Sequence, residues 1–211
     1  MCWQTKKRIV LVGDVGCGKT ALVAKLSQDL FLDFYSPTEF VEDFSAEIHS
    51  SKGTSCKLTV LDTSGCHEES NIRALAYKGC DAVIVCFDLT DEATLENVEA
   101  KWLPELKEHC PNVPVYLAGC KRDLTTCDSI RGCVCGGNCC TLSERELMEI
   151  IDRTGAVAYV ECSALTSEGV EDLFQIAVDA ATAKRKKSAK KIISSLKRKS
   201  KLLRRLSAAL I

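Results

Sequence analysis

The sequence predicts an α/β domain built on a mainly parallel sheet of six strands with helices on its faces. Short apolar runs typical of buried strands alternate with longer segments whose apolar residues recur at helical spacing. This alternation indicates a parallel sheet, because each crossover between parallel strands needs a long connection, usually a helix. The chain of 211 residues is long enough for one such domain and its core.

The elements are expected in a regular order along the chain. An apolar strand at residues 8–12 leads through a glycine-rich turn into a helix at residues 20–30. Residues 44–48 and 57–61 have the composition and the intervening turn of a β-hairpin. The other strands are expected at residues 81–87, 115–118 and 157–160, and the other helices at residues 94–109, 143–153 and 169–183. Ligands of such sheets bind at the carboxyl ends of the strands, so motifs that follow strands should meet at one edge.

The turn after the first strand matches the phosphate-binding pattern G-x-x-x-x-G-K-[ST] in full. It reads Gly13-Asp14-Val15-Gly16-Cys17-Gly18-Lys19-Thr20. Glycines let backbone N–H groups surround phosphate oxygens, and the N-terminus of the following helix favours anions. Lys19 is expected to contact the β- and γ-phosphates, and the Thr20 hydroxyl to bind Mg²⁺. A chance glycine-rich turn is the alternative, and the strand before and the helix after the motif argue against it.

A second motif selects the base of the nucleotide. Cys120, Lys121 and Asp123 follow the strand expected at residues 115–118. The Asp123 carboxylate can accept hydrogen bonds from N1–H and the exocyclic amine of guanine, whereas it would repel the N1 lone pair of adenine. The stem of Lys121 can lie along the face of the base. The two motifs together predict GTP and Mg²⁺ as ligands.

In order and spacing, these motifs resemble those of the small GTPases of the Ras superfamily. The resemblance also rests on Asp62-Thr63-Ser64-Gly65 and Glu161-Cys162-Ser163-Ala164-Leu165, and it covers about residues 8–183. It implies the small G domain of the P-loop NTPases, which we expect at residues 1–183.

Within the superfamily the chain looks like the Rho family, and most like its Rnd subgroup. Residues 101–105 and 110–114 are similar to Rho segments, and a Rho-type insert has room at about residues 124–142. Rnd proteins also lack the Gln after Asp-Thr-Ser-Gly, and they also have Cys before Lys-x-Asp. Here Cys120 replaces the usual Asn, which should weaken the guanine site without abolishing it.

The resemblance implies a role for each residue that matches a family motif. Thr38 should be the second hydroxyl ligand of Mg²⁺, and Asp62 should hold the ion through water. Phe31 should contact the guanine, Tyr35 should close over the phosphates, and the Gly65 N–H should contact the γ-phosphate. The predicted nucleotide site comprises Gly13, Asp14, Val15, Gly16, Cys17, Gly18, Lys19, Thr20, Ala21, Phe31, Tyr35, Thr38, Asp62, Gly65, Cys120, Lys121, Asp123, Ser163, Ala164 and Leu165. Singly, such residues are ordinary loop residues, so the argument depends on their order.

Two substitutions predict slow hydrolysis of GTP, and we assign no catalytic residue. In Ras-like proteins the Gln after Asp-x-x-Gly orients the attacking water. Cys66 occupies that position and has no amide. The branched side chain of Val15 should crowd the space that the water and a partner's arginine share. His67 or Glu68 could substitute for the Gln, and the alternative is a conventional Rho GTPase that cycles between GTP and GDP.

The chain has fourteen cysteines, which we expect to be mostly free thiols in the reducing cytosol. The apolar run near the N-terminus is too short for a signal peptide, and no stretch is long enough for a membrane span. Cys80, Cys86 and Cys162 are expected to act as small hydrophobic residues. Five cysteines crowd the expected insert: Cys127, Cys133, Cys135, Cys139 and Cys140. Their spacing lacks paired C-x₂-C units, so a loop of reduced thiols is favoured over a zinc or redox site.

Residues 184–211 form a basic tail. They hold twelve Lys or Arg and no acidic residue, which leaves a net charge of −13 on the rest of the chain. Leucines and Ile192 fall on one side of a helix and basic residues on the other, as in helices that bind anionic membranes or calmodulin-like partners. A nuclear-localisation or RNA-binding run and a solvated disordered tail are the alternatives. The last residues contain no cysteine for prenylation.

The combined hypothesis is a signalling protein that stays bound to GTP and recruits effector proteins through its switch regions. We expect it in the cytoplasm and peripherally at membranes, most of all the plasma membrane, with no nucleic acid as partner. Kinship with Rnd proteins implies a role in actin organisation. The competing hypotheses are an ordinary cycling GTPase and a scaffold with a vestigial nucleotide site, and intact Lys19, Thr20, Thr38 and Asp62 argue against the scaffold.

Overall fold

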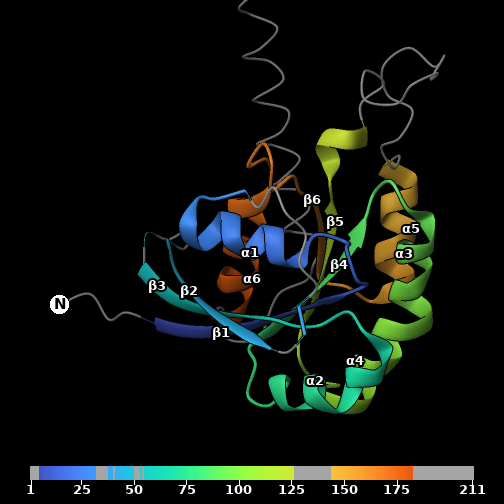
Figure 1. The fold of residues 1–211 in the computed structure, drawn as a ribbon, viewed down its shortest axis with the longest axis horizontal. Helices are drawn as coiled ribbons and strands as arrows, with labels where there is room; N and C mark the ends of the chain where they lie inside the picture. Colours follow the sequence, from blue (N-terminus) through green and yellow to red (C-terminus); the bar gives the residue numbers. More distant parts are fainter. Residues whose placement is uncertain are drawn as a thin grey trace, which may run out of the picture.

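The computed structural model describes residues 5–31, 38–39, 41–49, 53, 55–125 and 144–182. Their strands form one six-stranded sheet in the order β2-β3-β1-β4-β5-β6. The strands are β1 (Thr5–Gly13), β2 (Glu42–His49), β3 (Ser55–Asp62), β4 (Ala82–Asp88), β5 (Val115–Cys120) and β6 (Ala158–Glu161). Among these described strands, β2 pairs antiparallel with β3, and the other neighbours pair parallel. The predicted α/β fold with a mainly parallel sheet is therefore confirmed (Figure 1).

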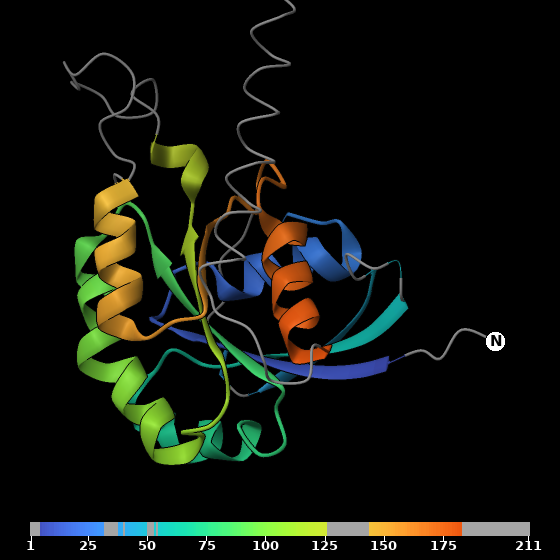
Figure 2. The ribbon, with the colours of Figure 1, turned by 180° about the vertical axis from the view of Figure 1, so that it is seen from behind.

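Helices cover both faces of this sheet, as the views from opposite sides show (Figures 1 and 2). One face carries α1 (Lys19–Gln28) and α6 (Val170–Thr182). The other carries α2 (Ser70–Ala76), a long helix and α5 (Glu144–Thr154). The long helix consists of α3 (Glu92–Asn97), the π-helical turn η2 (Val98–Trp102) and α4 (Leu103–His109). Short 3₁₀ turns occur at η1 (His67–Glu69) and η3 (Arg122–Thr125).

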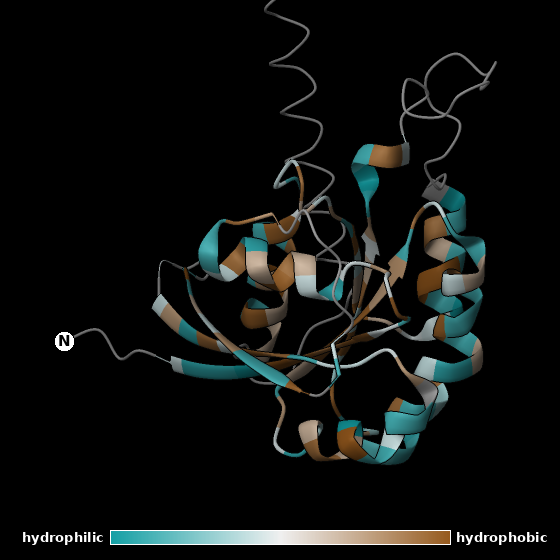
Figure 3. Cartoon of the chain, in the orientation of Figure 1, coloured by the Kyte–Doolittle hydropathy of each residue, from teal (hydrophilic) through white to brown (hydrophobic). Residues whose placement is uncertain are grey.

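The core has two halves because successive side chains of a strand point to opposite faces. In β1, Ile9 and Leu11 pack with α1 and α6, whereas Val10 and Val12 pack with Trp102 and its neighbours. All seven residues of β4 are buried, as expected for a central parallel strand covered on both faces. Figure 3 shows apolar strands inside and more polar surfaces on the surrounding helices.

The structure differs from the sequence prediction in several elements. Helix α2 was not predicted, because it is short and buries only Arg73 and Ala76 rather than an apolar stripe. Helix α1 ends at Gln28 instead of residue 30, since Asp29 adopts a left-handed conformation and returns its N–H to the Lys25 carbonyl. The long helix begins two residues earlier than predicted, where the Asp91 side chain accepts the Ala93 N–H.

Residues 126–143 and 183–211 lie outside the described residues. The predicted insert, apart from its first two residues, and the predicted basic tail fall in these segments, so they stay predictions. Among the described residues, no helix has both the length and the apolar character that crossing a membrane requires.

Candidate functional site

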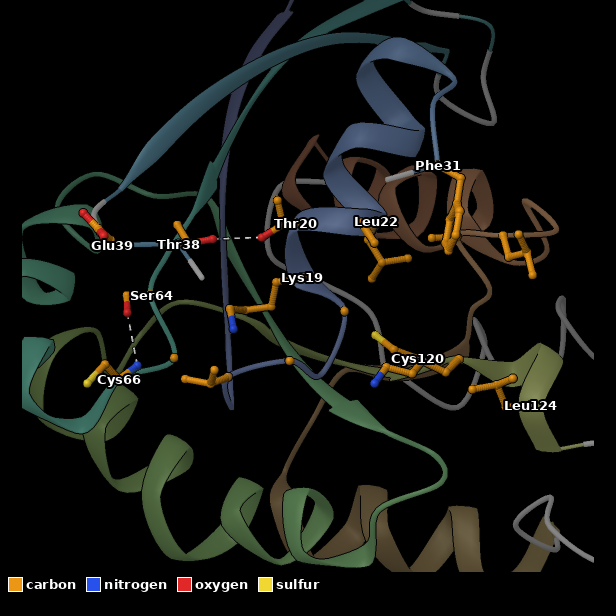
Figure 4. Close-up of a pocket in the computed structure, with 18 of the residues that line it drawn as sticks. Lys19, Thr20, Leu22, Phe31, Thr38, Glu39, Ser64, Cys66, Cys120 and Leu124 are labelled. Atoms are coloured by element: carbon orange, nitrogen blue, oxygen red, sulfur yellow. Dashed lines mark hydrogen bonds between the residues drawn. The ribbon is translucent and has the colours of Figure 1, made fainter. Parts of the chain in front are cut away.

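A cavity of about 730 Å³ lies at the carboxyl ends of the parallel strands, where the sequence motifs meet. Figure 4 shows the side chains that line it. Fifteen residues of the predicted site, Cys66 included, line this cavity: Val15, Gly16, Gly18, Lys19, Thr20, Ala21, Phe31, Thr38, Gly65, Cys66, Cys120, Lys121, Asp123, Ala164 and Leu165. The volume is of the size that encloses a nucleotide-sized ligand.

The glycine-rich loop between β1 and α1 forms the floor of the cavity. Gly13 has a φ of 146°, and a Cβ there would stand 2.1 Å from the Cys86 carbonyl oxygen, so no other residue fits. The Lys19 ammonium donates to the carbonyl oxygens of Gly13 and Asp14, both at 2.8 Å. These bonds hold a buried positive charge inside the loop, where phosphate oxygens are attracted.

Three oxygen-bearing side chains from separate segments converge beside the loop. Thr20 donates to Asp62 at 2.6 Å, the Thr20 and Thr38 hydroxyls lie 2.9 Å apart, and Thr38 donates to Asp62 at 3.2 Å. The dashed line between Thr20 and Thr38 marks this contact in Figure 4. The Asp62 side chain is fully buried, and its Oδ1 has no hydrogen-bond partner among the described residues. Burial raises the pKa of Asp62, although Thr20 and Lys19 favour the charged form.

These residues fit a magnesium ion. Mg²⁺ prefers hard oxygen ligands, and it is typically held by one or two protein oxygens together with phosphates and water. A cation would also compensate the buried carboxylate, one oxygen of which receives no hydrogen bond from any described residue.

The opposite end of the cavity fits a planar base. Phe31 and Leu124 lie on either side of this end (Figure 4). Ser163 donates to the Asp123 carboxylate at 2.5 Å and accepts the Thr166 N–H, which fixes the carboxylate on the cavity wall. The Lys121 ammonium contacts Asp88 at 2.6 Å. Burial opposes ionisation of Asp88, but hydrogen bonds from Lys121 and Thr90 lower its pKa overall.

Cys120 supports the loop from behind. Its side chain is buried, and a Cβ at Gly18 would stand 3.2 Å from the Cys120 Cβ. This close approach places an apolar thiol where the resemblance expects an asparagine amide.

The third part of the cavity is the end where the γ-phosphate is expected. Gly65 packs directly on the loop, since a Cβ there would stand 2.4 Å from the Val15 backbone nitrogen. Cys66 donates its N–H to Ser64 Oγ at 3.1 Å, and its side chain lines the cavity. The Val15 side chain also lines this end and is 54% exposed.

Some predicted residues lie outside the cavity wall. The Asp14 carboxylate accepts hydrogen bonds from Asn97 at 2.7 Å and Trp102 at 2.9 Å, so it points toward the long helix. The Cys17 thiol lies in the core, where burial raises its pKa to about 12. Three other predicted residues make the contacts described above without lining the cavity: Gly13, Asp62 and Ser163. Tyr35 falls outside the described residues.

Sequence reasoning missed five residues that line the cavity: Leu22, Glu39, Ser64, Glu69 and Leu124. Glu69 is the most informative, because its Oε2 is buried and has no partner among the described residues. Glu68, which the sequence analysis considered as a substitute for the missing Gln, is exposed. Periodicity could not identify Glu69, since it lies in the short turn η1.

A buried ionic network behind the cavity was also missed. The Arg73 guanidinium contacts Glu105 through two hydrogen bonds at 2.9 and 2.8 Å and stacks on Trp102 at 5.0 Å. It also donates to the carbonyl oxygens of Ser64 and Cys66, and Lys101 donates to that of Gly65. Three successive carbonyls at the γ-phosphate end are thereby held by basic side chains.

The family comparison agrees with this geometry. The sequence model of the Ras family matches residues 8–183, which include every described part of the cavity. Guanine-nucleotide binding, usually with Mg²⁺, is a property of this family. The chain therefore belongs to the Ras family and is a small GTP-binding protein.

Proposed function

We propose that this protein holds GTP and Mg²⁺ for long periods and hydrolyses GTP slowly. The observation that carries the proposal is the pair Cys66 and Val15, which both line the γ-phosphate end of the cavity. Neither side chain can accept and donate hydrogen bonds as a glutamine amide does. Without an oriented water, the in-line attack on the γ-phosphate loses its positioning.

Each end of the cavity has its own task in holding the nucleotide. Lys19 and the loop N–H groups bind the phosphates, and Thr20, Thr38 and Asp62 hold the cation. Asp123, braced by Ser163, selects guanine through its paired acceptor oxygens. The cation, when bound, supplies positive charge that neutralises the phosphates.

Glu69 gives specific support to the second candidate, a conventional GTPase that cycles between GTP and GDP. Its buried Oε2, which has no partner in the part of the chain that the structure describes, belongs to a residue of the cavity wall and could accept a hydrogen bond from water. Glu69 occupies another position than the missing Gln, so a rate measurement must decide between the two candidates.

The finer classification and the cellular role belong to the same proposal. Segments 101–105 and 110–114 and the Cys120-Lys121-x-Asp123 motif support a Rho-type, Rnd-like protein. Such a protein would recruit effectors through its switch regions and regulate actin. The basic tail would place it peripherally at anionic membranes, most of all the plasma membrane, by charge and apolar contact.

Two measurements test the proposal. Nucleotide extracted from the purified protein should be GTP, and recovery of GDP alone or ATP would contradict the reading. In single-turnover assays the rate should be at or below roughly 10⁻⁴ s⁻¹, the intrinsic Ras scale. Cys66→Gln combined with Val15→Gly should raise this rate, whereas the matched control Cys66→Ala should not. A Glu69→Gln variant that lowers a measurable wild-type rate would favour the cycling GTPase.

A further inference from the structure

Two cysteines lie next to each other at the end of the sheet opposite the nucleotide cavity. Cys80 lies two residues before the start of β4, and Cys110 lies between the end of α4 and the start of β5. Parallel strands β4 and β5 are neighbours, and the Val83 N–H donates to the Pro114 carbonyl at 3.0 Å where they begin. The loops that carry the two cysteines therefore enter the sheet side by side.

Packing brings the two thiols together. Cys80 packs against the half of the core that contains buried Cys110, and the two thiols are close enough for each to shift the pKa of the other. Tyr77 accepts the Cys80 N–H at its carbonyl, and its ring stacks on His109 with centroids 6.0 Å apart. The neighbours of each cysteine thus touch as well, which fixes the two loops relative to each other.

We propose that Cys80 and Cys110 form a redox-active dithiol that exchanges with low-molecular-weight disulfides and closes into an intramolecular disulfide. The half-buried Cys80 is the attacking thiol, and the more deeply buried Cys110 is the resolving thiol. This pairing of an accessible cysteine with a shielded partner is typical of thiols that oxidise reversibly.

The electrostatic surroundings assign the same roles. The hydrogen bond with Cys110 lowers the pKa of Cys80, and the charge of Arg8 acts in the same direction, against burial and Asp81. The pKa of Cys110 is raised by its hydrogen bond with Cys80, by burial and by Glu105. The thiolate is the nucleophile in exchange, so Cys80 attacks first.

The exchange balances with glutathione disulfide as oxidant. The Cys80 sulfur bonds to one glutathione sulfur as the S–S bond of the reagent breaks, and the released thiolate takes the Cys80 proton. The Cys110 sulfur then bonds to Cys80 and displaces the second glutathione, which takes the Cys110 proton. The protein loses two hydrogen atoms and two electrons, and the reagent becomes two thiols.

The closed bond would join the segment that follows α2 to the end of α4. Figures 1 and 2 both show α2 and α4 next to each other. Tyr77 and Glu105 already bridge them by a hydrogen bond beside the Arg73 network. Oxidation would therefore fasten the helix that follows the γ-phosphate loop.

The test uses the full chain, folded in GTP and Mg²⁺ and treated with glutathione disulfide. After alkylation of free thiols and tryptic digestion, mass spectrometry should find peptide 79–101 linked to peptide 108–121. These peptides also contain Cys86 and Cys120, so variants must identify the bond. Cys80→Ser should abolish the link, and Cys110→Ser should stop at a glutathione adduct on Cys80.

Cys86→Ala is the matched control, because it removes the other thiol of the same peptide. The link should persist in this variant. Loss of the link in Cys86→Ala, its survival in Cys80→Ser, or its formation only after unfolding in urea would each overturn the proposal. As a further control, wild-type protein that is kept in dithiothreitol and receives no glutathione disulfide should not contain the linked peptides.

Discussion

The Arg73–Glu105 pair offers the sharpest test of how the γ-phosphate end is held in place. The Arg73 and Glu105 side chains are 1% and 11% exposed, and two hydrogen bonds join them. Replacing Arg73 with Met would leave the Glu105 carboxylate buried with Tyr77 as its remaining donor. Removal of one partner from a buried ion pair costs about 3–5 kcal/mol of the free energy of unfolding. Loss of the donor to Ser64 and Cys66 adds to this cost.

The assay is urea unfolding of the wild type, Arg73→Met, Glu105→Leu and the double variant at one fixed GTP concentration. Fixed nucleotide is essential, because ligand binding itself stabilises the native state. Each single variant leaves an unpaired charge, whereas the double variant removes both. The free energy of unfolding of the double variant should therefore be at least as large as that of the less stable single variant. Two results would refute the idea that each charge needs the other: losses of the free energy of unfolding that simply add in the double variant, or a loss below about 1 kcal/mol in Arg73→Met.

Three further predictions follow from other contacts. Burial opposes ionisation of Glu105, but hydrogen bonds from Arg73 and Tyr77 lower its pKa overall. The ionised carboxylate therefore contributes fully to the free energy of unfolding above its unfolded pKa of about 4.3, and this contribution is lost as pH falls through the lower pKa of the folded state. The free energy of unfolding should thus fall more steeply with acidification in the wild type than in the double variant Arg73→Met, Glu105→Leu. Trp102→Phe removes a donor to the Asp14 carboxylate and should cost about 1.5–3 kcal/mol in urea unfolding, and a neutral result would contradict this value. Gly13→Ala should abolish binding of a fluorescent GTP analogue, because its Cβ would collide with the Cys86 carbonyl. The control Gly53→Ala also places alanine at a positive φ, of 74°, but its Cβ would have open space, so this variant should bind the analogue normally.

The sequence was most informative where one local pattern determines the structure. The strands were predictable from apolar runs, and the glycine-rich loop from its spacing, because both are local properties of the chain. Asp62 and Thr38 were placed through the family resemblance, and the hydrogen bonds that join them to Thr20 are consistent with the metal-site prediction.

Features that depend on contacts between distant segments could not be predicted. Helix α2 has no apolar stripe, and its Arg73 is buried only because Glu105, 32 positions later, neutralises it. The nucleotide-site prediction for Asp14 stays a prediction, and its carboxylate is bound by Asn97 and Trp102, which lie 83 and 88 positions away. No local pattern reports such partners. The tail and insert hypotheses remain predictions from composition.

The three carbonyl bonds at residues 64–66 also determine where backbone donors point. A trans peptide unit is planar, so its N–H points opposite to its C=O. Arg73 of α2 binds the Ser64 carbonyl, so the N–H of Gly65, which belongs to the same peptide unit, points away from the guanidinium. The donor expected to contact the γ-phosphate is thus oriented by Arg73, which Glu105 of α4 holds in place. The protein sets the orientation of this reading group through its own side chains, so the ligand need not spend binding energy to create it.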